Sequence, residues 1–313
     1  MRPWHRKLLV DTAKMAIPFP RTLRRLKRRY IPYRTNDSND SGLLADGLDQ
    51  IRLLRQKMEI DGIEVVEFGS GWLPIIPFLW RIAGAKTIVL TDQERLLDRS
   101  LLRQAAAFIW GRADDVAATL GVTLDRVHDI VGPSLTAGGG IDEALACAGL
   151  HYVVPFAASK MRASSADIIV SRAVLEHVPP WVLENFMVEF WRILRPGGVM
   201  CHVIDMSDHW EHNDKSICRV NFLRYGESFW RMTGINCQNY QNRLRHPEYL
   251  AIVRASGFVV IGDEAKCDAA TLECLAEIPL AARFKGIAKE ELAILTGTIV
   301  ARKSDLPPFG MVG

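Results

Sequence analysis

The chain has 313 residues, of which 49% are hydrophobic and 24% are charged, and its formal net charge at pH 7 is +3. These values indicate a globular protein with one large domain and an appended segment. They exclude a membrane-spanning protein, because no uncharged apolar run approaches the length of a bilayer-crossing helix.

The cysteines indicate a reducing compartment. They stand at positions 147, 201, 218, 237, 267 and 274, with no Cys-x-x-Cys pair and no zinc-site spacing. The apolar part of the N-terminus is interrupted by Asp11 and Lys14, which argues against a secretory signal. We therefore expect free thiols and a cytoplasmic protein.

The first part of the chain is strongly basic. Residues 1–34 hold eleven Lys and Arg against Asp11 alone. Within this arm, Arg21–Tyr33 has the spacing of a short amphipathic helix, which either contacts anionic lipid or nucleic acid or, as we favour, packs its narrow apolar stripe on the body. The polar stretch Thr35–Gly42 is typical of a linker. We predict an arm and linker over residues 1–42 and the main domain over residues 43–303.

Helices and strands alternate through the main domain. An apolar helical face from Leu44 to Met58 precedes the first strand and would cover one side of a ligand cleft. The predicted strands are Ile63–Val66, Lys86–Leu90, His151–Val154, Asp167–Val170, Val199–Ile204, Phe258–Ile261 and Ile294–Ala301. One predicted helix follows the first strand directly. The others occupy Leu96–Trp110, part of Arg112–Val131, Ile141–Ala148, Pro180–Leu194 and Pro247–Ser256. The alternation predicts an α/β fold, a doubly wound sheet with helices on both faces.

Two segments are longer than this alternation requires. The connection before the third strand is longer than a single crossover helix needs, so we predict an insertion over about residues 111–148. Residues of about 205–245 are rich in His, Asp, Asn and aromatic side chains. They follow a strand end, where substrate loops of α/β sheets lie, and we predict a substrate-side segment there.

The stretch Ile63–Asp92 has the pattern of an adenosine-cofactor site. It runs as strand, glycine turn, helix and strand, and it ends in a carboxylate. Glycines allow close backbone approach, a helix N-terminus offers unpaired N–H groups, and a carboxylate at a strand end can accept both ribose hydroxyls. A lone Gly-x-Gly is weak support, and the third glycine of the dinucleotide pattern is absent, since Trp72, Leu73 and Pro74 follow Gly71.

Four motifs taken together make the prediction more specific. They are EFGSGW at residues 67–72, Asp92, DIIVSRAVLEHV at residues 167–178 and LRPGGV at residues 194–199. In this order they resemble the class I S-adenosylmethionine-dependent methyltransferases, most closely the small-molecule branch. The resemblance covers roughly residues 63–301 and implies a seven-stranded, mostly parallel sheet whose last strand is antiparallel.

The resemblance also implies site residues and S-adenosyl-L-methionine as the cofactor. Glu67, Gly69 and Gly71 would surround the methionine part of the cofactor, the backbone at Ser70 and Gly71 would meet its carboxylate, and Asp92 would hold the ribose. The remaining cofactor-binding assignments are Gln93, beside the adenine, and Ser171. An acidic residue that the family often has beside the adenine is replaced here by Pro155-Phe156-Ala157.

The acceptor side is predicted to lie after two strand ends. A hydroxyl acceptor requires a base near the transferred methyl group, and the candidates for this role are His177, Asp205 and His209. Glu176 and His177 could instead order the loop that closes on the cofactor. The Asp and His side chains of the polar cluster from His202 to Asp214 would also suit a divalent metal ion. Their spacing matches no defined metal site, however, and we assign no metal ligands.

Amide and guanidinium groups at residues 221–225 and 242–245 would suit a polar or anionic acceptor, although these arginines could equally pair with acidic residues of the body. We therefore expect a small-molecule or glycan acceptor, with O-methylation favoured and no DNA partner. The alternatives are an RNA methyltransferase anchored by the basic arm, a non-catalytic cofactor-binding partner protein and a nicotinamide oxidoreductase. The sequence does not indicate the oligomeric state.

Overall fold

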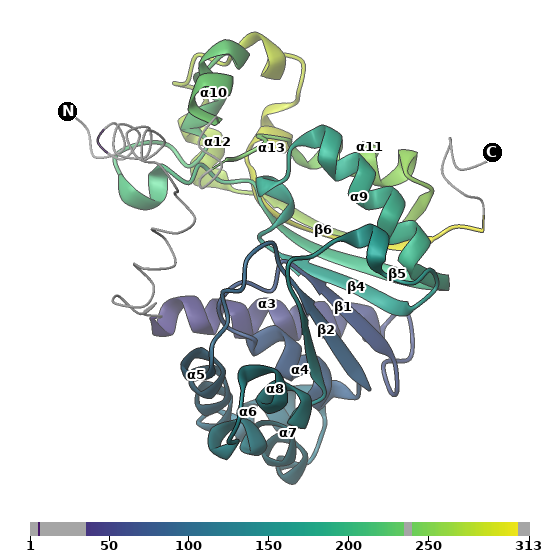
Figure 1. Ribbon diagram of the computed structural model, residues 1–313. Coiled ribbons are helices and arrows are strands. Elements are labelled where there is room, and N and C mark those ends of the chain that lie inside the picture. Colours follow the sequence, from purple (N-terminus) through teal and green to yellow (C-terminus); the bar gives the residue numbers. More distant parts are fainter. Residues whose placement is uncertain (1–5, 7–35, 235–239, 306–313) are drawn as a thin grey trace, which may run out of the picture.

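The fold is built on one seven-stranded sheet (Figure 1). The computed structural model describes Arg6 and residues 36–234 and 240–305. The strands are β1 (Glu64–Phe68), β2 (Thr87–Thr91), β3 (Leu150–Val153), β4 (Ala166–Arg172), β5 (Leu194–Asp205), β6 (Phe258–Cys267) and β7 (Ile294–Lys303). Their order is β3-β2-β1-β4-β5-β7-β6. Only β7 runs antiparallel to its neighbours, so all seven predicted strands and the predicted topology are confirmed.

Helices cover both faces of the sheet (Figure 1). On one face α3 (Asp37–Arg55) and α4 (Ile75–Ala83) pack over Val65, Ile88 and Ile168. On the other face α9 (Pro180–Ile193) and α11 (His246–Ala255) pack over side chains that alternate with those three along the strands. The sheet is therefore buried on both sides, which explains why its central strands read as continuous apolar runs.

The predicted insertion is a helical layer beside the first face. Its helices are α5 (Arg99–Trp110), α6 (Ala113–Leu120), α7 (Leu124–Thr136) and α8 (Ile141–Cys147). Where the sequence suggested one helix over part of residues 112–131, the structure has two. Gly121 ends α6 with a φ of 65°, a left-handed conformation that glycine adopts without steric cost.

The prediction of a linker over Thr35–Gly42 was wrong from residue 37 onward, because α3 begins there. Asn36 caps this helix by accepting a hydrogen bond from the Asn39 N–H at 2.8 Å. Asp37 and Asp40 lie in the first turn, where negative charge is favourable. The polar residues that resembled a linker are thus an N-terminal cap. The rest of the predicted arm, apart from Arg6, lies outside the described residues.

A third hydrophobic cluster forms at one end of the sheet. It joins the segment after β5, including α10 (Glu227–Gly234), to α12 (Ala269–Leu275) and α13 (Lys289–Leu292) (Figure 1). A disulfide between Cys218 and Cys274 links the two parts. The expectation of free thiols was therefore wrong for these two cysteines; Cys147, Cys201 and Cys267 are free, and Cys237 lies outside the described residues.

Within the described part of the chain, no helix combines the length and apolar character needed to cross a membrane.

Candidate active site

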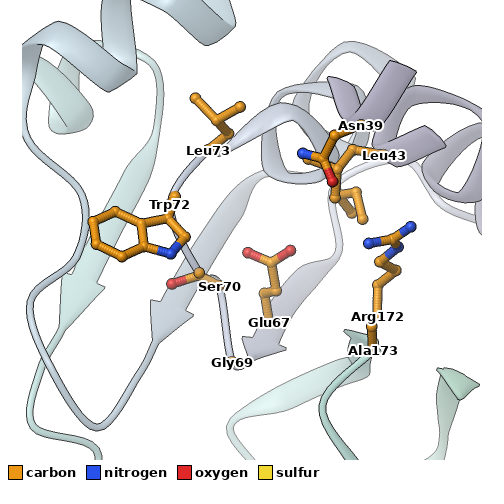
Figure 2. A pocket seen from close by; sticks show the side chains of 11 residues that line it. Asn39, Leu43, Glu67, Gly69, Ser70, Trp72, Leu73, Arg172 and Ala173 are labelled. Atoms are coloured by element: carbon orange, nitrogen blue, oxygen red, sulfur yellow. The ribbon is translucent and has the colours of Figure 1, made fainter. Parts of the chain in front are cut away.

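A cavity of about 220 Å³ lies where β1 and β4 end (Figure 2). The loop after β1 forms one wall with Ser70 and Trp72, and Arg172 and Asn39 form the opposite wall. Asn39 belongs to α3, so the helix before the first strand covers one side of the cleft, as predicted. The full lining is Asn39, Leu43, Glu67, Gly69, Ser70, Gly71, Trp72, Leu73, Ile76, Arg172 and Ala173.

The glycine turn after β1 needs its glycines. Gly69 has a φ of 77°, and a Cβ added there would lie 2.5 Å from a methyl carbon of Val174. Gly71 has a φ of 63°, but an added Cβ would meet no protein atom within 4 Å. Gly69 therefore permits contact between two loops, whereas Gly71 leaves space open in the cavity wall.

Asp92 holds the glycine turn in place. Its carboxylate accepts hydrogen bonds from the Gly71 N–H at 3.0 Å and from the Gln93 N–H at 2.7 Å. The Ser70 N–H donates to the Thr91 carbonyl at 2.9 Å. Both N–H groups expected to meet the cofactor's carboxylate thus already have partners within the protein. Asp92 and Gln93 lie beside the cavity and are not part of its lining.

Glu67 is the buried acid of the cavity. Its side chain points between the two walls (Figure 2) and is 5% exposed, and its Oε2 atom has no hydrogen-bond partner. Burial, with a smaller contribution from repulsion by Asp92, raises the pKa of Glu67 to about 8. A buried carboxyl group with a free oxygen and an elevated pKa is typical of a group that awaits a cationic or hydrogen-donating ligand.

This elevated pKa makes stability depend on pH. The folded protein keeps the Glu67 proton up to a pKa of about 8, whereas the unfolded chain loses it near the ordinary glutamate pKa of 4.5, so stability falls as pH rises through that window. We expect Glu67→Gln to remove up to about 4 kcal/mol of this fall. Urea denaturation of the cofactor-free protein at pH 5 to 9 measures it, and parallel pH profiles for the wild type and the variant would show that Glu67 ionises normally.

The three predicted catalytic residues are brought together from the loops after β4 and β5. The ring centroids of His177 and His209 are 5.1 Å apart, and His209 Nε2 lies 3.4 Å from Asp205 Oδ2. Buried Glu176 lies beside them. Although burial opposes its ionisation, hydrogen bonds from His209 and Ser207 hold the pKa of Asp205 below its ordinary value. Desolvation by the neighbouring loops lowers the pKa of His177, although the residue keeps an exposed face, and this favours its neutral imidazole.

Two residues near position 240 hold these loops. Gln241 accepts a hydrogen bond from the His209 N–H at 3.1 Å and donates to the Ser207 carbonyl at 2.8 Å. Asn242 donates to the carbonyls of Leu175 and Val178. The residues after β4 and β5 are thus fixed by one short strap, Gln241-Asn242.

Other predicted polar residues lie elsewhere. The Ser171 side chain is buried 2.7 Å from His202 Nδ1 and does not line the cavity. His202 is fully buried, and burial lowers its pKa to about 3. Asp208 is also buried and accepts a hydrogen bond from the Trp210 N–H. These residues stabilise the fold around the site.

Of the two roles considered for these arginines, an anionic acceptor or an acidic partner in the body, the structure shows the second for Arg243 and neither for Arg245. Arg243 donates to the carbonyls of Phe222 and Tyr225 and pairs with Glu227. Arg245, 0% exposed, donates to the carbonyls of three residues, and it does not face solvent. Guanidinium groups here satisfy buried backbone carbonyls, because each offers several donors in a fixed plane.

The cavity fits the amino-acid end of S-adenosylmethionine. Glu67 Oε2 and Ser70 Oγ are buried polar atoms without partners, and the space over Gly71 is open. Arg172, which the sequence reasoning missed, offers a guanidinium group on the facing wall while its Nε donates to Asp46. A carboxylate matches Arg172, and an ammonium group matches Glu67. Ala173, also on the lining, has a φ of 53°, which is uncommon outside glycine and often marks functional loops.

Comparisons with known proteins found the following similarities. A family model described as a methyltransferase domain matches residues 141–202. No curated protein matches the chain. Solved structures that are similar to it include an S-adenosylmethionine-dependent methyltransferase from Mesorhizobium loti, with 15% identity, a TM-score of 0.45 and coverage of 83% of this chain and 100% of that one. Another is an S-adenosylmethionine-dependent methyltransferase from Methanosarcina mazei, with 14% identity, a TM-score of 0.41 and coverage of 80% and 97%.

Proposed function

We propose that this chain is a class I S-adenosylmethionine-dependent methyltransferase and that it methylates a hydroxyl group of a small-molecule or glycan acceptor. The observation that supports this proposal is the cluster of His177, Asp205 and His209. Ala173, which lines the cavity, and His177 both follow β4 and are four residues apart, which supports a place for the cluster near the cofactor.

A hydroxyl acceptor explains why such a cluster is needed. S-adenosylmethionine supplies a methyl group already activated by its sulfonium sulfur, so the protein has to align the acceptor, exclude water and take a proton. The acceptor oxygen attacks the methyl carbon, the bond from that carbon to sulfur breaks, and the hydroxyl proton passes to the cluster. His177 suits this step, since its Nδ1 lies 2.8 Å from the Tyr240 carbonyl oxygen, which can only accept. Nδ1 then carries the ring proton and Nε2 keeps a lone pair.

A second cavity, of about 460 Å³, supports the acceptor class. It adjoins this cluster through Tyr240 and is lined by Pro180, Trp181, Glu227, Trp230, Arg231, Tyr240, Asn242 and Arg283. Trp181 is 67% exposed there. Aromatic faces beside carboxylate and guanidinium groups suit a polar molecule with ring faces, such as a sugar.

Labelled methyl transfer tests the proposal. The protein is incubated with methyl-labelled S-adenosylmethionine and, separately, with a fraction of polar small molecules, an oligosaccharide fraction and RNA. We expect base-stable label, as in an O-methyl ether, in one of the first two fractions. His177→Gln should lower turnover by about 10²- to 10⁴-fold, since that is the usual contribution of a general base. Its affinity for S-adenosylhomocysteine should change little.

Two outcomes would contradict the proposal. Label found in RNA would assign the RNA alternative. Cofactor binding without transfer to any of the three fractions, and with His177→Gln indistinguishable from the wild type, would support a non-catalytic partner protein.

A further inference from the structure

Three side chains at the acceptor end of the site are of the kinds that bind metal ions, and their ligand atoms lie close together. Glu176 and His177 follow β4, and His209 follows β5. One ring nitrogen or carboxylate oxygen from each lies within 4.8 Å of those from the other two. The set unites one carboxylate and two imidazoles from loops that are 32 residues apart at His177 and His209.

Glu176 is the strongest sign that the set has a ligand. Its side chain is 2% exposed, and neither of its carboxylate oxygens has a hydrogen-bond partner. A buried carboxyl group stays ionised only when it is paired, hydrogen-bonded or bound to a metal. Asp205 lies close enough to repel it, so a second negative charge makes the need for a cation greater.

The histidines are held as metal-binding histidines usually are. The His177 Nδ1 donates to the Tyr240 carbonyl oxygen at 2.8 Å, which leaves Nε2 with its lone pair. A ligating imidazole almost always donates its other nitrogen to such an acceptor. His209 Nε2 is buried and faces Asp205 Oδ2 at 3.4 Å, while its backbone N–H donates to Gln241.

We infer that Glu176, His177 and His209 bind one divalent transition-metal ion. Two imidazoles with one carboxylate suit Zn²⁺, Mn²⁺, Fe²⁺ or Co²⁺ better than Mg²⁺ or Ca²⁺, which prefer oxygen ligands. Three protein ligands leave coordination positions open, as in catalytic rather than structural sites. The role that follows rests on the proposed function: the bound cation would lower the pKa of the acceptor hydroxyl so that its proton passes to solvent, and His177, the base in the metal-free protein, would be a ligand instead.

Co²⁺ binding tests the site without any methyl transfer. Protein treated with a chelator is titrated with Co²⁺, whose visible absorption reports coordination by protein nitrogen, and the affinity is repeated for Zn²⁺ by calorimetry. We expect one equivalent to bind. Glu176→Gln, which keeps the side chain's shape, and His209→Ala should each weaken binding at least tenfold.

His212→Ala is the matched control. His212 stacks against His209, with ring centroids 5.0 Å apart, but it does not belong to the set. It should bind Co²⁺ as the wild type does. Far-ultraviolet circular dichroism shows whether each variant is folded, and Glu176→Gln carries the test if His209→Ala is not.

Equal binding by wild type, Glu176→Gln and His209→Ala would overturn the inference, as would an equal loss in His212→Ala. Neither result touches the proposed function, because methyl transfer by metal-free protein is measured separately. The converse result is also distinguishable. If the protein binds one equivalent of Co²⁺ through Glu176 and His209 but methylates none of the three acceptor fractions, the metal site is supported and the proposed methyl transfer is contradicted.

Discussion

Gly69→Ala should abolish S-adenosylhomocysteine binding and lower the free energy of unfolding by about 2–4 kcal/mol. The added Cβ would lie 2.5 and 2.8 Å from the two methyl carbons of Val174, and the backbone φ of 77° is unfavourable for alanine. Relief of the clash moves the loop after β4 away from the glycine turn. That loop begins after Arg172, supplies Ala173 to the cavity and leads to His177, so cofactor binding and catalysis both fail. Calorimetry and urea denaturation measure the two effects.

Two variants separate the clash from backbone strain. Gly121→Ala has the same kind of strain, with a φ of 65°, but no atom within 4 Å of the added Cβ, and it should cost only about 1 kcal/mol with normal binding. Val174→Ala removes both clashing methyl carbons, so the double variant Gly69→Ala/Val174→Ala should bind more tightly than Gly69→Ala alone. If the double variant binds S-adenosylhomocysteine no more tightly than Gly69→Ala does, the close contact with Val174 is not the reason that glycine is needed at position 69.

Arg245→Lys should lower the free energy of unfolding by about 3 kcal/mol or more. Arg245 is fully buried and donates to the carbonyls of Met206, Leu292 and Ile294. A lysine keeps the charge but has no planar fork, so it leaves some of these carbonyls without donors. Since Met206 follows β5 directly, the loss should also disorder the loop that carries His209 and lower methyl transfer more than cofactor binding.

The control for this prediction is Arg254→Lys. Arg254 is exposed on α11, and its replacement should change stability by less than about 0.5 kcal/mol. An equally small effect of Arg245→Lys, measured by urea denaturation, would show that the buried carbonyls find other partners.

The sequence predicted the sheet well because its physical signals are local. Residues 168–170 (Ile-Ile-Val) are an uninterrupted apolar run, which is what a strand covered on both faces requires, and they form the centre of β4. Residues that follow strand ends meet at one edge of a parallel sheet. For that reason His177 and His209, which the sequence suggested as two separate candidates for the base, lie together in the structure.

The remaining features depend on tertiary contacts that no local pattern encodes. Arg243 and Arg245 looked like ligand-binding arginines, and only the packing around them shows that their partners are backbone carbonyls. Asn39 was taken for part of a linker, yet the capped start of α3 places it in the cavity wall. The one local signal was the series of polar residues around Asn36, which can cap a helix as well as form a turn. Cys218 and Cys274 are 56 residues apart, and nothing in their spacing pairs them.

The most direct test of the central claim is a calorimetric titration of the full chain with S-adenosylhomocysteine. We expect one molecule to bind per chain. Proton uptake by the buffer should accompany binding below about pH 8, since Glu67 would ionise as it pairs with the ligand's ammonium group. Asp92→Ala should lose this binding because it removes the partner of the Gly71 N–H. Absence of binding in the wild type, or a rise in melting temperature with NADH and none with S-adenosylhomocysteine, would contradict the account.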